Sequence, residues 1–285
     1  MIALAENSYG KSSVRVMKVK RDGPLHTVKE WKVEVLLSGD FATCFTVGDN
    51  SGILPTDTMK NTVYARARES TAECIEDFAR ELVAFFLARN PQVASATINI
   101  ASTQWENALV QGKPYPSTFL RGTSEVQTTT VTSAQGGAVS VTSGFEGLVI
   151  LKTANSGFEG YLRDSLTTLP ETADRLFGTS ASAQWSYRSA SLPFAELRKK
   201  LREALLQAFA EHDSKSVQHT LYAMAQAALD ATPEITDIEL AMPNKHCLLV
   251  DLSRFGQTNP NEIFVPVDEP YGNIKARISR ETKGP

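Results

Sequence analysis

Side chains that can act as acids, bases, nucleophiles or metal ligands are present in this sequence, but they do not form a generic catalytic motif. The chain contains no HExxH, no CxxC pair, no P-loop and no GxGxxG. Its four histidines are too scattered to suggest a metal site by spacing; they are His26, His212, His219 and His246. We therefore expect no metal ion and no flavin, haem or nicotinamide cofactor.

Three side chains of the second half could bind a ligand, although each also has an ordinary structural explanation. Phe158 lies in a glycine-flanked stretch and is typical of a core aromatic that anchors a loop. Arg175 could form a surface ion pair, but its planar donors can also match two acceptors at once. Gln218 could be an exposed polar residue, yet its amide offers both a donor and an acceptor. The residues alone leave these alternatives open.

Four further polar side chains each have an ordinary structural explanation as well. Lys11 follows a glycine and could be a solvated charge; as a base it would need burial or a nearby cation to disfavour its ammonium form. Thr56 could cap a helix, whose exposed backbone donors also favour negative charge. Asn244 and His246 are expected on a hairpin loop, where an asparagine is common and a lone histidine is more often structural than catalytic.

The elements that must position these residues follow one pattern twice. In the first half, runs rich in β-branched residues predict strands, and apolar residues at helical spacing predict two helices. Ser70 and Glu73 form a capping-box signature before the longer helix, and Asn90-Pro91 ends it. The strands are expected at residues 13–20, 30–37, 94–105 and 119–132, and the first helix at 56–68.

The second half repeats this order after Gln135-Gly136-Gly137, the best linker candidate. A short helix is expected near residues 171–177, and Asp213-Ser214 is expected to cap the last helix. Residues 243–246 are expected to join the last two strands as a hairpin loop. The strands are expected at 139–152, 183–188, 235–242 and 248–252, and the long helix at 194–210. The predicted domains are residues 1–135 and 136–285.

This order predicts an α+β fold with antiparallel sheets and helices on one face of each sheet. The other face of each sheet has to find a partner, and we expect another copy of the chain to cover it. The repeated pattern therefore favours an oligomer.

Composition excludes several classes of protein. The 285 residues have a formal net charge of -3 and a pI of about 5.9, whereas a nucleic-acid binder would show a basic excess. No apolar run is long enough to span a bilayer. The N-terminus lacks a signal-peptide pattern and the C-terminus does not read Ser-Lys-Leu. The three cysteines are expected to be reduced thiols; they are Cys44, Cys74 and Cys247. Reduced thiols and the absence of both targeting patterns predict a cytoplasmic protein.

Five segments, in order along nearly the whole chain, resemble the urate oxidase (uricase) family. They are Tyr9-Gly10-Lys11, the stretch from Asp49 to Thr62, residues 147–175, residues 216–222 and residues 240–246. Each segment alone is a weak signal, but five in the family's order are specific. The chain departs from the family at Ala154, where Ser or Thr is usual, and at Leu166, where an aromatic is usual. Neither position is one that the resemblance assigns to catalysis.

The resemblance implies that each chain folds as a tandem pair of T-fold units. Four chains would then assemble into a barrel pierced by a tunnel. It also implies that each active site is shared between subunits of this homotetramer. The first half of one chain would supply Lys11, Thr56 and Asp57, and the neighbouring chain would supply the residues of the second half.

The resemblance also implies a role for each candidate residue. Phe158 would stack on the flat purine, Arg175 and Gln218 would hold its two edges, and Val217 would contribute a backbone group. Thr56 and Asp57 would also contact the substrate. Asn244 would line the oxygen or peroxide pocket. A proton relay would consist of Lys11, Thr56 and His246.

The reaction that the resemblance implies is oxidation of urate by O2 and water to 5-hydroxyisourate and hydrogen peroxide, in purine breakdown, with no cofactor. A related T-fold enzyme acting on pterins, such as a GTP cyclohydrolase, needs zinc, and this chain lacks that Cys/His set. The alternative is a purine- or pterin-binding T-fold protein without turnover. The combination of Lys11, Thr56 and His246 argues against it, because binding alone would not need a relay.

Overall fold

The computed structural model describes residues 2–281, so residues 1 and 282–285 lie outside the described part. The expectations about a signal peptide and a C-terminal peroxisomal signal fall partly on those residues. The chain divides into two compact units. Unit 1 comprises Met1–Phe145 and Ser186–Glu196, and unit 2 comprises Glu146–Trp185 and Leu197–Pro285.

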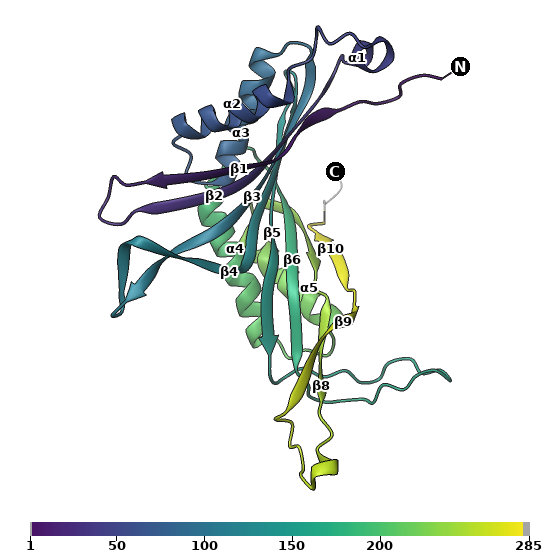
Figure 1. Ribbon diagram of the computed structural model, residues 1–285. Helices are drawn as coiled ribbons and strands as arrows, with labels where there is room; N and C mark the ends of the chain where they lie inside the picture. Colours follow the sequence, from purple (N-terminus) through teal and green to yellow (C-terminus); the bar gives the residue numbers. More distant parts are fainter. Residues whose placement is uncertain (1, 282–285) are drawn as a thin grey trace. The chain divides into compact units, whose positions relative to one another are not determined.

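Unit 1 is built on an antiparallel sheet in which neighbouring strands also follow each other in sequence (Figure 1). Alternate residues of the strands point into the core, as the alternation of β-branched and polar residues predicts. Val33, Val35 and Leu37 are fully buried. The strands are β1 (Tyr9–Lys20), β2 (Thr27–Gly39), β3 (Val93–Val110) and β4 (Lys113–Ala134), followed by the first part of β5 (Val139–Lys152). All four strands predicted for this part of the chain are confirmed.

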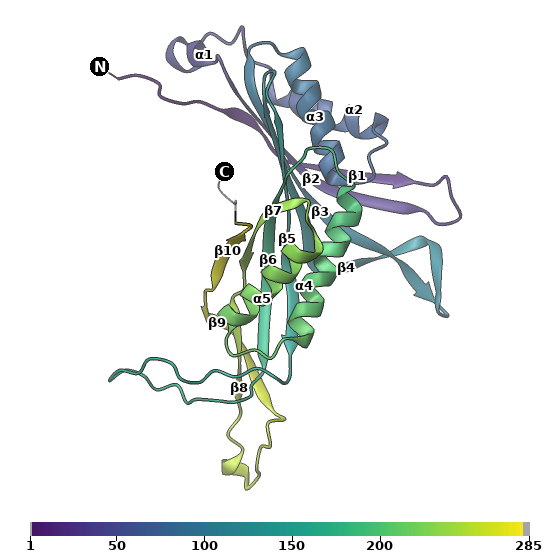
Figure 2. The same ribbon diagram turned by 180° about the vertical axis from the view of Figure 1, so that it is seen from behind.

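Two helices cover one face of this sheet, α2 (Thr56–Glu69) and α3 (Ile75–Arg89) (Figures 1 and 2). The apolar stripe of α3 is buried, and Phe78 stacks on Trp31 with ring centroids 4.8 Å apart. Both helices were predicted, and α3 ends at Asn90 as expected. The sequence did not predict a further short helix, α1 (Ala42–Val47), which ends at Gly48 with φ of 74°.

The helix caps differ from those that the sequence predicts. The N-cap of α2 is Pro55, so Thr56 is the first helical residue and does not cap the helix with its side chain. The prediction of a capping box formed by Ser70 and Glu73 is also wrong, because the N-cap of α3 is Cys74. The Ser70 hydroxyl instead accepts from the Ala72 N–H, and Glu73 forms ion pairs with lysines of β1 and β2. Sequence spacing alone did not reveal these competing partners.

Unit 2 also carries antiparallel strands with helices on one face, α4 (Phe194–Glu211) and α5 (Val217–Ala231) (Figure 2). After the second part of β5 come β6 (Phe177–Tyr187), β7 (Ile235–Ala241) and β10 (Lys275–Ser279) in the sheet. A separate hairpin of β8 (Asn244–Leu249) and β9 (Phe264–Gly272) encloses the short helix η1 (Ser253–Phe255), and β8 also pairs with β6. The fold is therefore α+β, with T-fold units as expected.

Four predictions for the second half are wrong. The strand expected at 248–252 is one of them, because β8 spans Asn244–Leu249 and residues 250–252 form no strand. Residues 171–177 form no helix, because Thr172 pairs with Phe158 and the Arg175 N–H donates to the Ser156 carbonyl. The N-cap of α5 is Ser216 rather than Asp213-Ser214. Residues 243–246 are not a hairpin loop, since β8 begins at Asn244 and pairs with β6 and β9, whereas β7 pairs with β10.

No helix within residues 2–281 is both long and apolar enough to cross a membrane. The three cysteines are free thiols, and each is partly exposed rather than buried. Cys74 lies at the start of α3, where burial raises its pKa to about 12.

Candidate active site

Lys11 lies near the start of β1, next to a glycine that the packing of the sheet requires. A Cβ atom at Gly10 would overlap the carbonyl oxygen of Val35 on β2, so only glycine allows the two strands to approach this closely. Directly after Lys11 the register shifts, and Ser13 takes a positive φ of 58°. A bulge of this kind bends the strand locally, so the regular pairing of β1 is interrupted directly after Lys11.

Thr56 and Asp57 occupy the first turn of α2, where backbone N–H groups have no partner within the helix. Asp57 accepts a hydrogen bond from Lys60 and one of 3.0 Å from Asn61 Nδ2. The pKa of Asp57 is lowered, first by the Lys60 hydrogen bond and charge, and to a smaller extent by the positive charge of Lys11. Lys11 therefore lies within electrostatic range of the first turn of α2. Thr56 and Asp57 are thus neighbours in one helical turn, and the Lys11 charge acts on Asp57.

Phe158 and Arg175 come from two parts of a loop that is held together by backbone hydrogen bonds. The Phe158 N–H donates to the Thr172 carbonyl over 2.8 Å, and the Thr172 N–H donates back over 3.2 Å. The Arg175 N–H donates to the Ser156 carbonyl over 2.7 Å. This pairing places the Arg175 guanidinium carbon 5.2 Å from the centre of the Phe158 ring. The guanidinium thus lies over the face of the Phe158 ring in a cation–π contact.

The same loop is tied to the beginning of α5. The Gly157 N–H donates to the Ser214 carbonyl over 2.8 Å, and the Ser214 N–H donates to the Asn155 carbonyl over 3.0 Å. Two residues later Ser216 caps the helix by accepting from the His219 N–H. Val217 and Gln218 are the first two residues of α5, with Val217 buried and Gln218 exposed. The first turn of α5 is therefore fixed beside the Phe158–Arg175 pair.

Arg175 is half-buried, and burial lowers its pKa. The Phe158 ring under the guanidinium offsets part of the cost of burying this charge. An anion placed over Phe158 would restore the lost solvation. The electrostatics of this loop therefore favour a negatively charged ligand.

Tyr161 is a residue of this group that sequence reasoning missed. Its ring stacks on Phe158 with centroids 4.8 Å apart and planes 14° from parallel, and its hydroxyl donates to the Leu169 carbonyl. It supports the Phe158 ring in one orientation. The spacing of two aromatics around Gly160, which has φ of 69°, was the available signal.

Asn244 and His246 lie on β8 rather than on a loop. Asn244 pairs with Thr179 of β6 on one side and with Gly272 of β9 on the other. Lys245 pairs with Gly178, so His246 lies near the start of β6. Strand β6 begins at Phe177, two residues after Arg175 in the sequence. The two side chains are therefore held on a hydrogen-bonded strand, which fixes their positions better than a loop would.

Two of the four histidines meet, although their sequence spacing did not indicate it. His212 Nε2 and His219 Nδ1 are 3.1 Å apart, next to the first turn of α5. Burial and the neighbouring His219 lower the pKa of His212. Among the described residues, no cluster of three or more His, Cys, Asp or Glu side chains could hold a metal ion.

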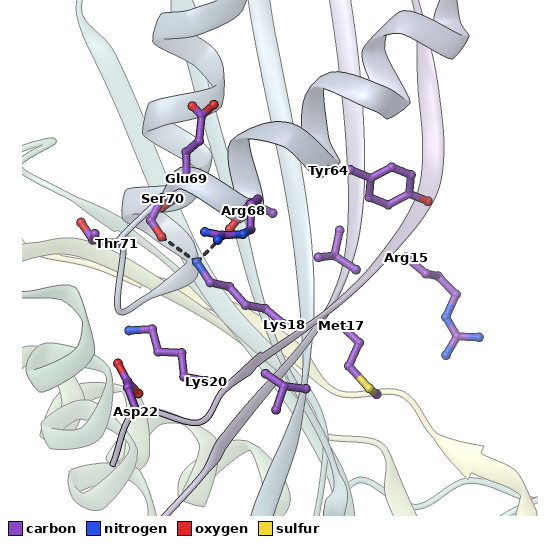
Figure 3. Close-up of a pocket in the computed structure, with 13 residues that line it drawn as sticks. Arg15, Met17, Lys18, Lys20, Asp22, Tyr64, Arg68, Glu69, Ser70 and Thr71 are labelled. Carbon is purple, nitrogen blue, oxygen red and sulfur yellow. Dashed lines mark hydrogen bonds between the residues drawn. The ribbon is translucent and has the colours of Figure 1, made fainter.

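A separate groove of about 700 Å³ lies in unit 1 between β1 and the end of α2 (Figure 3). None of the residues expected at the active site lines it. Lys18 extends from β1 and donates to the carbonyls of Ala67 and Ser70 over 2.8 and 2.6 Å. It thereby satisfies carbonyls at the C-terminal end of α2, so its role there is structural.

The described geometry thus forms two groups, each within one unit. Unit 1 provides an ammonium group beside a helix N-terminus, and unit 2 provides an aromatic face, a guanidinium and a second helix N-terminus. Helix N-termini and a half-buried arginine attract anions, and an amide beside them can bind an N–H next to a carbonyl.

Comparison with known proteins agrees with this chemistry. The uricase family model matches residues 7–132 and 141–275. The chain is 40% identical over 280 residues to a uricase of Arthrobacter globiformis, covering 98% of this chain and 91% of that protein. The chain belongs to the uricase family.

Two further relatives support the membership over the full length. A uricase of Aspergillus flavus is 36% identical over 298 residues, covering 99% of this chain and 98% of the relative. The crystal structure of the uricase from Arthrobacter globiformis superposes with a TM-score of 0.93 at 38% identity, covering 100% of this chain and 97% of that one. The fold of this uricase-family chain is therefore that of its relatives.

Proposed function

We propose that this uricase-family chain is a urate oxidase that works without a metal or organic cofactor. The observation that carries the proposal is the half-buried Arg175 guanidinium beside the Phe158 ring, in a loop bonded to the segment that leads into α5. Urate is flat and anionic, so it can take the place of the guanidinium over the Phe158 ring while the guanidinium moves to the edge of the ligand. Phe158 stacks on its ring system, while Arg175 and Gln218 bind opposite edges and the Val217 backbone adds a contact.

We infer that the first turn of α2 and the Lys11 ammonium handle protons. Lys11 acts as the base through the Thr56 hydroxyl, and His246 orients the relay and moves protons. Asp57 also contacts the substrate, and Asn244 lines the pocket for O2 or peroxide. The Lys11 charge acts on Asp57 at the start of α2, which supports a place for Lys11 near Thr56; the role as base rests on the family resemblance.

The reaction needs O2 as its only oxidant. Loss of a proton to the relay makes urate electron-rich, and urate then gives two electrons to O2 and forms a peroxide on the purine. The peroxide leaves as hydrogen peroxide, and water adds in its place. Urate, O2 and water thus yield 5-hydroxyisourate and hydrogen peroxide. The chain supplies binding, deprotonation and a pocket for O2.

We also propose that the active chain is a homotetramer whose sites are shared between subunits. Large apolar side chains are exposed on two hairpins, and such surfaces commonly mark interfaces. On the β3–β4 hairpin they are Leu109, Val110, Tyr115 and Leu120, and on the β8–β9 hairpin they are Leu248, Leu249, Phe255, Ile263 and Val265. Lys11, Thr56 and Asp57 of one chain then complete the site formed by the second half of its neighbour.

We also propose that the chain consists of two T-fold units, residues 1–135 and residues 136–285. The turn at Gln135-Gly136-Gly137, where Gly136 has φ of 67°, supports a repeat boundary there. The three free thiols support a reducing compartment such as the cytoplasm.

Removal of the arginine tests the proposed binding site. Arg175→Ala should raise the KM for urate roughly 10- to 100-fold, because a hydrogen bond to a charged group contributes about 1.5–3 kcal/mol. Gln218→Ala should raise KM by a smaller factor. Steady-state kinetics on urate would measure both changes.

The matched control is Arg89→Ala, which removes a guanidinium 4.9 Å from the Phe85 ring in unit 1. It should leave KM unchanged. If Arg175→Ala kept the KM of the unmodified chain while it remained folded, urate would not bind at the Phe158–Arg175 pair and the proposed site would be wrong.

A further inference from the structure

One hydrogen bond in unit 1 joins the two segments that carry Lys11 and Thr56. The backbone N–H of Leu54 donates to the hydroxyl oxygen of Tyr9 over 2.8 Å. Tyr9 precedes Lys11 by two residues on β1, and Leu54 precedes Thr56 by two residues. The bond therefore connects strand and helix directly beside both residues.

The direction of the side chains agrees with this connection. Residues two apart on a strand point to the same face, so Lys11 faces the same side of β1 as Tyr9. The Tyr9 hydroxyl reaches the segment that leads into α2, and the charge of Lys11 acts on Asp57 in the first turn of that helix. Tyr9 thus contacts the segment before α2, and Lys11 lies on the same face of β1.

Tyr9 is itself held firmly in place. Its ring meets the buried Phe41 edge to face, with centroids 4.8 Å apart, and it packs against the core of unit 1. On the other side of β1, the absence of a side chain at Gly10 lets the strand lie tightly against Val35. The Tyr9 hydroxyl is consequently a fixed acceptor for Leu54 rather than a mobile one.

We propose that Tyr9 is a positioning residue of the proton relay, whose hydroxyl fixes Thr56 relative to Lys11. The inference rests on the proposed function of Lys11 and Thr56. Proton transfer depends steeply on the distance between donor and acceptor, and a displacement of about 1 Å can lower a rate on the order of 100-fold. Tyr9 does not touch the substrate in this account.

A second tether between the same two elements provides a structural comparison. Lys18 joins β1 to the other end of α2 through the carbonyls of Ala67 and Ser70 (Figure 3). Lys18→Met removes that tether far from the relay. Tyr64→Phe removes a hydroxyl from a half-exposed tyrosine of α2 and matches the chemical change at Tyr9.

The experiment compares Tyr9→Phe, Thr56→Ala and their double variant in the full chain. Tyr9→Phe should lower kcat about 10-fold with KM for urate unchanged, and it should shift the pH dependence of kcat because the relay is misaligned. The double variant should be no slower than Thr56→Ala, because Tyr9 acts through Thr56. Lys18→Met should lower the thermal midpoint without changing kcat, and Tyr64→Phe should change neither.

Each outcome decides one point. If Thr56→Ala is slow but Tyr9→Phe keeps full kcat, the positioning role is wrong and the relay stands. If the two effects multiply, Tyr9 acts elsewhere and the inference is also wrong. If Thr56→Ala keeps full kcat, the relay itself fails. Should Tyr9→Phe lower stability, amide hydrogen exchange of residues 49–58 still reports the bond: faster exchange with unchanged kcat overturns the proposal.

Discussion

A chain carrying Lys11→Met should turn over urate at least about 100-fold more slowly than the unmodified chain, with little change in urate affinity. Methionine keeps most of the side-chain length but cannot accept a proton, so only the base is removed. A loss confined to kcat is typical of a group that acts on the transition state, whereas a loss of uniform binding raises KM. Stopped-flow binding and steady-state turnover separate the two quantities.

Lys199→Met is the matched control, because it makes the same change on an exposed lysine of α4. It should have no effect on kcat. Full turnover by Lys11→Met together with weaker urate binding would reverse the assignment, and Lys11 would then be a binding residue.

Two impaired chains should recover activity when they are refolded together and assayed at urate concentrations below the KM of the unmodified chain. One carries Lys11→Met and the other Gln218→Ala. In a mixed dimer with shared sites, one site has both defects, and the other takes an intact Lys11 from one chain and an intact Gln218 from its partner. Sites contained within a single chain predict no recovery, because every site keeps one lesion.

The assay is urate turnover after co-refolding, with each variant refolded alone as the control and mixed assembly verified by differently tagged chains. The recovered activity should approach that of one intact site for each mixed pair. Absence of recovery despite verified mixed assembly would show that the sites are not shared between subunits.

Local patterns in the sequence predicted most of the fold. Strand β2 and helix α3 have strong periodic apolar patterns, and both were located correctly because burial of Val33, Val35 and the Phe78 face determines them. The segment at 171–177 was predicted as a helix and is not one. Its backbone groups are bound by Phe158 and Ser156, residues distant in sequence that no local pattern reveals.

The pairing of β7 could not be predicted for the same reason. A loop at residues 243–246 between two alternating segments favours a hairpin, but β7 pairs with β10, more than thirty residues further along the chain. The consequence for the site is that Asn244 and His246 lie on a paired strand.

The candidate residues came from the family resemblance rather than from generic motifs. The structure adds how unit 2 brings Phe158, Arg175 and the first turn of α5 together, through backbone bonds around Ser156 and Ser214. Tyr9 had no predicted role, because a hydroxyl bonded to a distant backbone N–H leaves no mark in the sequence. Tyr161 had none either, although the two aromatics around Gly160 were a signal for its stacking on Phe158.

The central claim is that this chain alone oxidises urate with O2. The most direct test is to add protein that has been exhaustively treated with chelator to urate in metal-free buffer. We predict loss of the ultraviolet absorbance of urate, with one O2 consumed and one hydrogen peroxide formed for each urate. Loss of activity on chelation that a single added metal restores, or binding of urate without any turnover, would contradict the account.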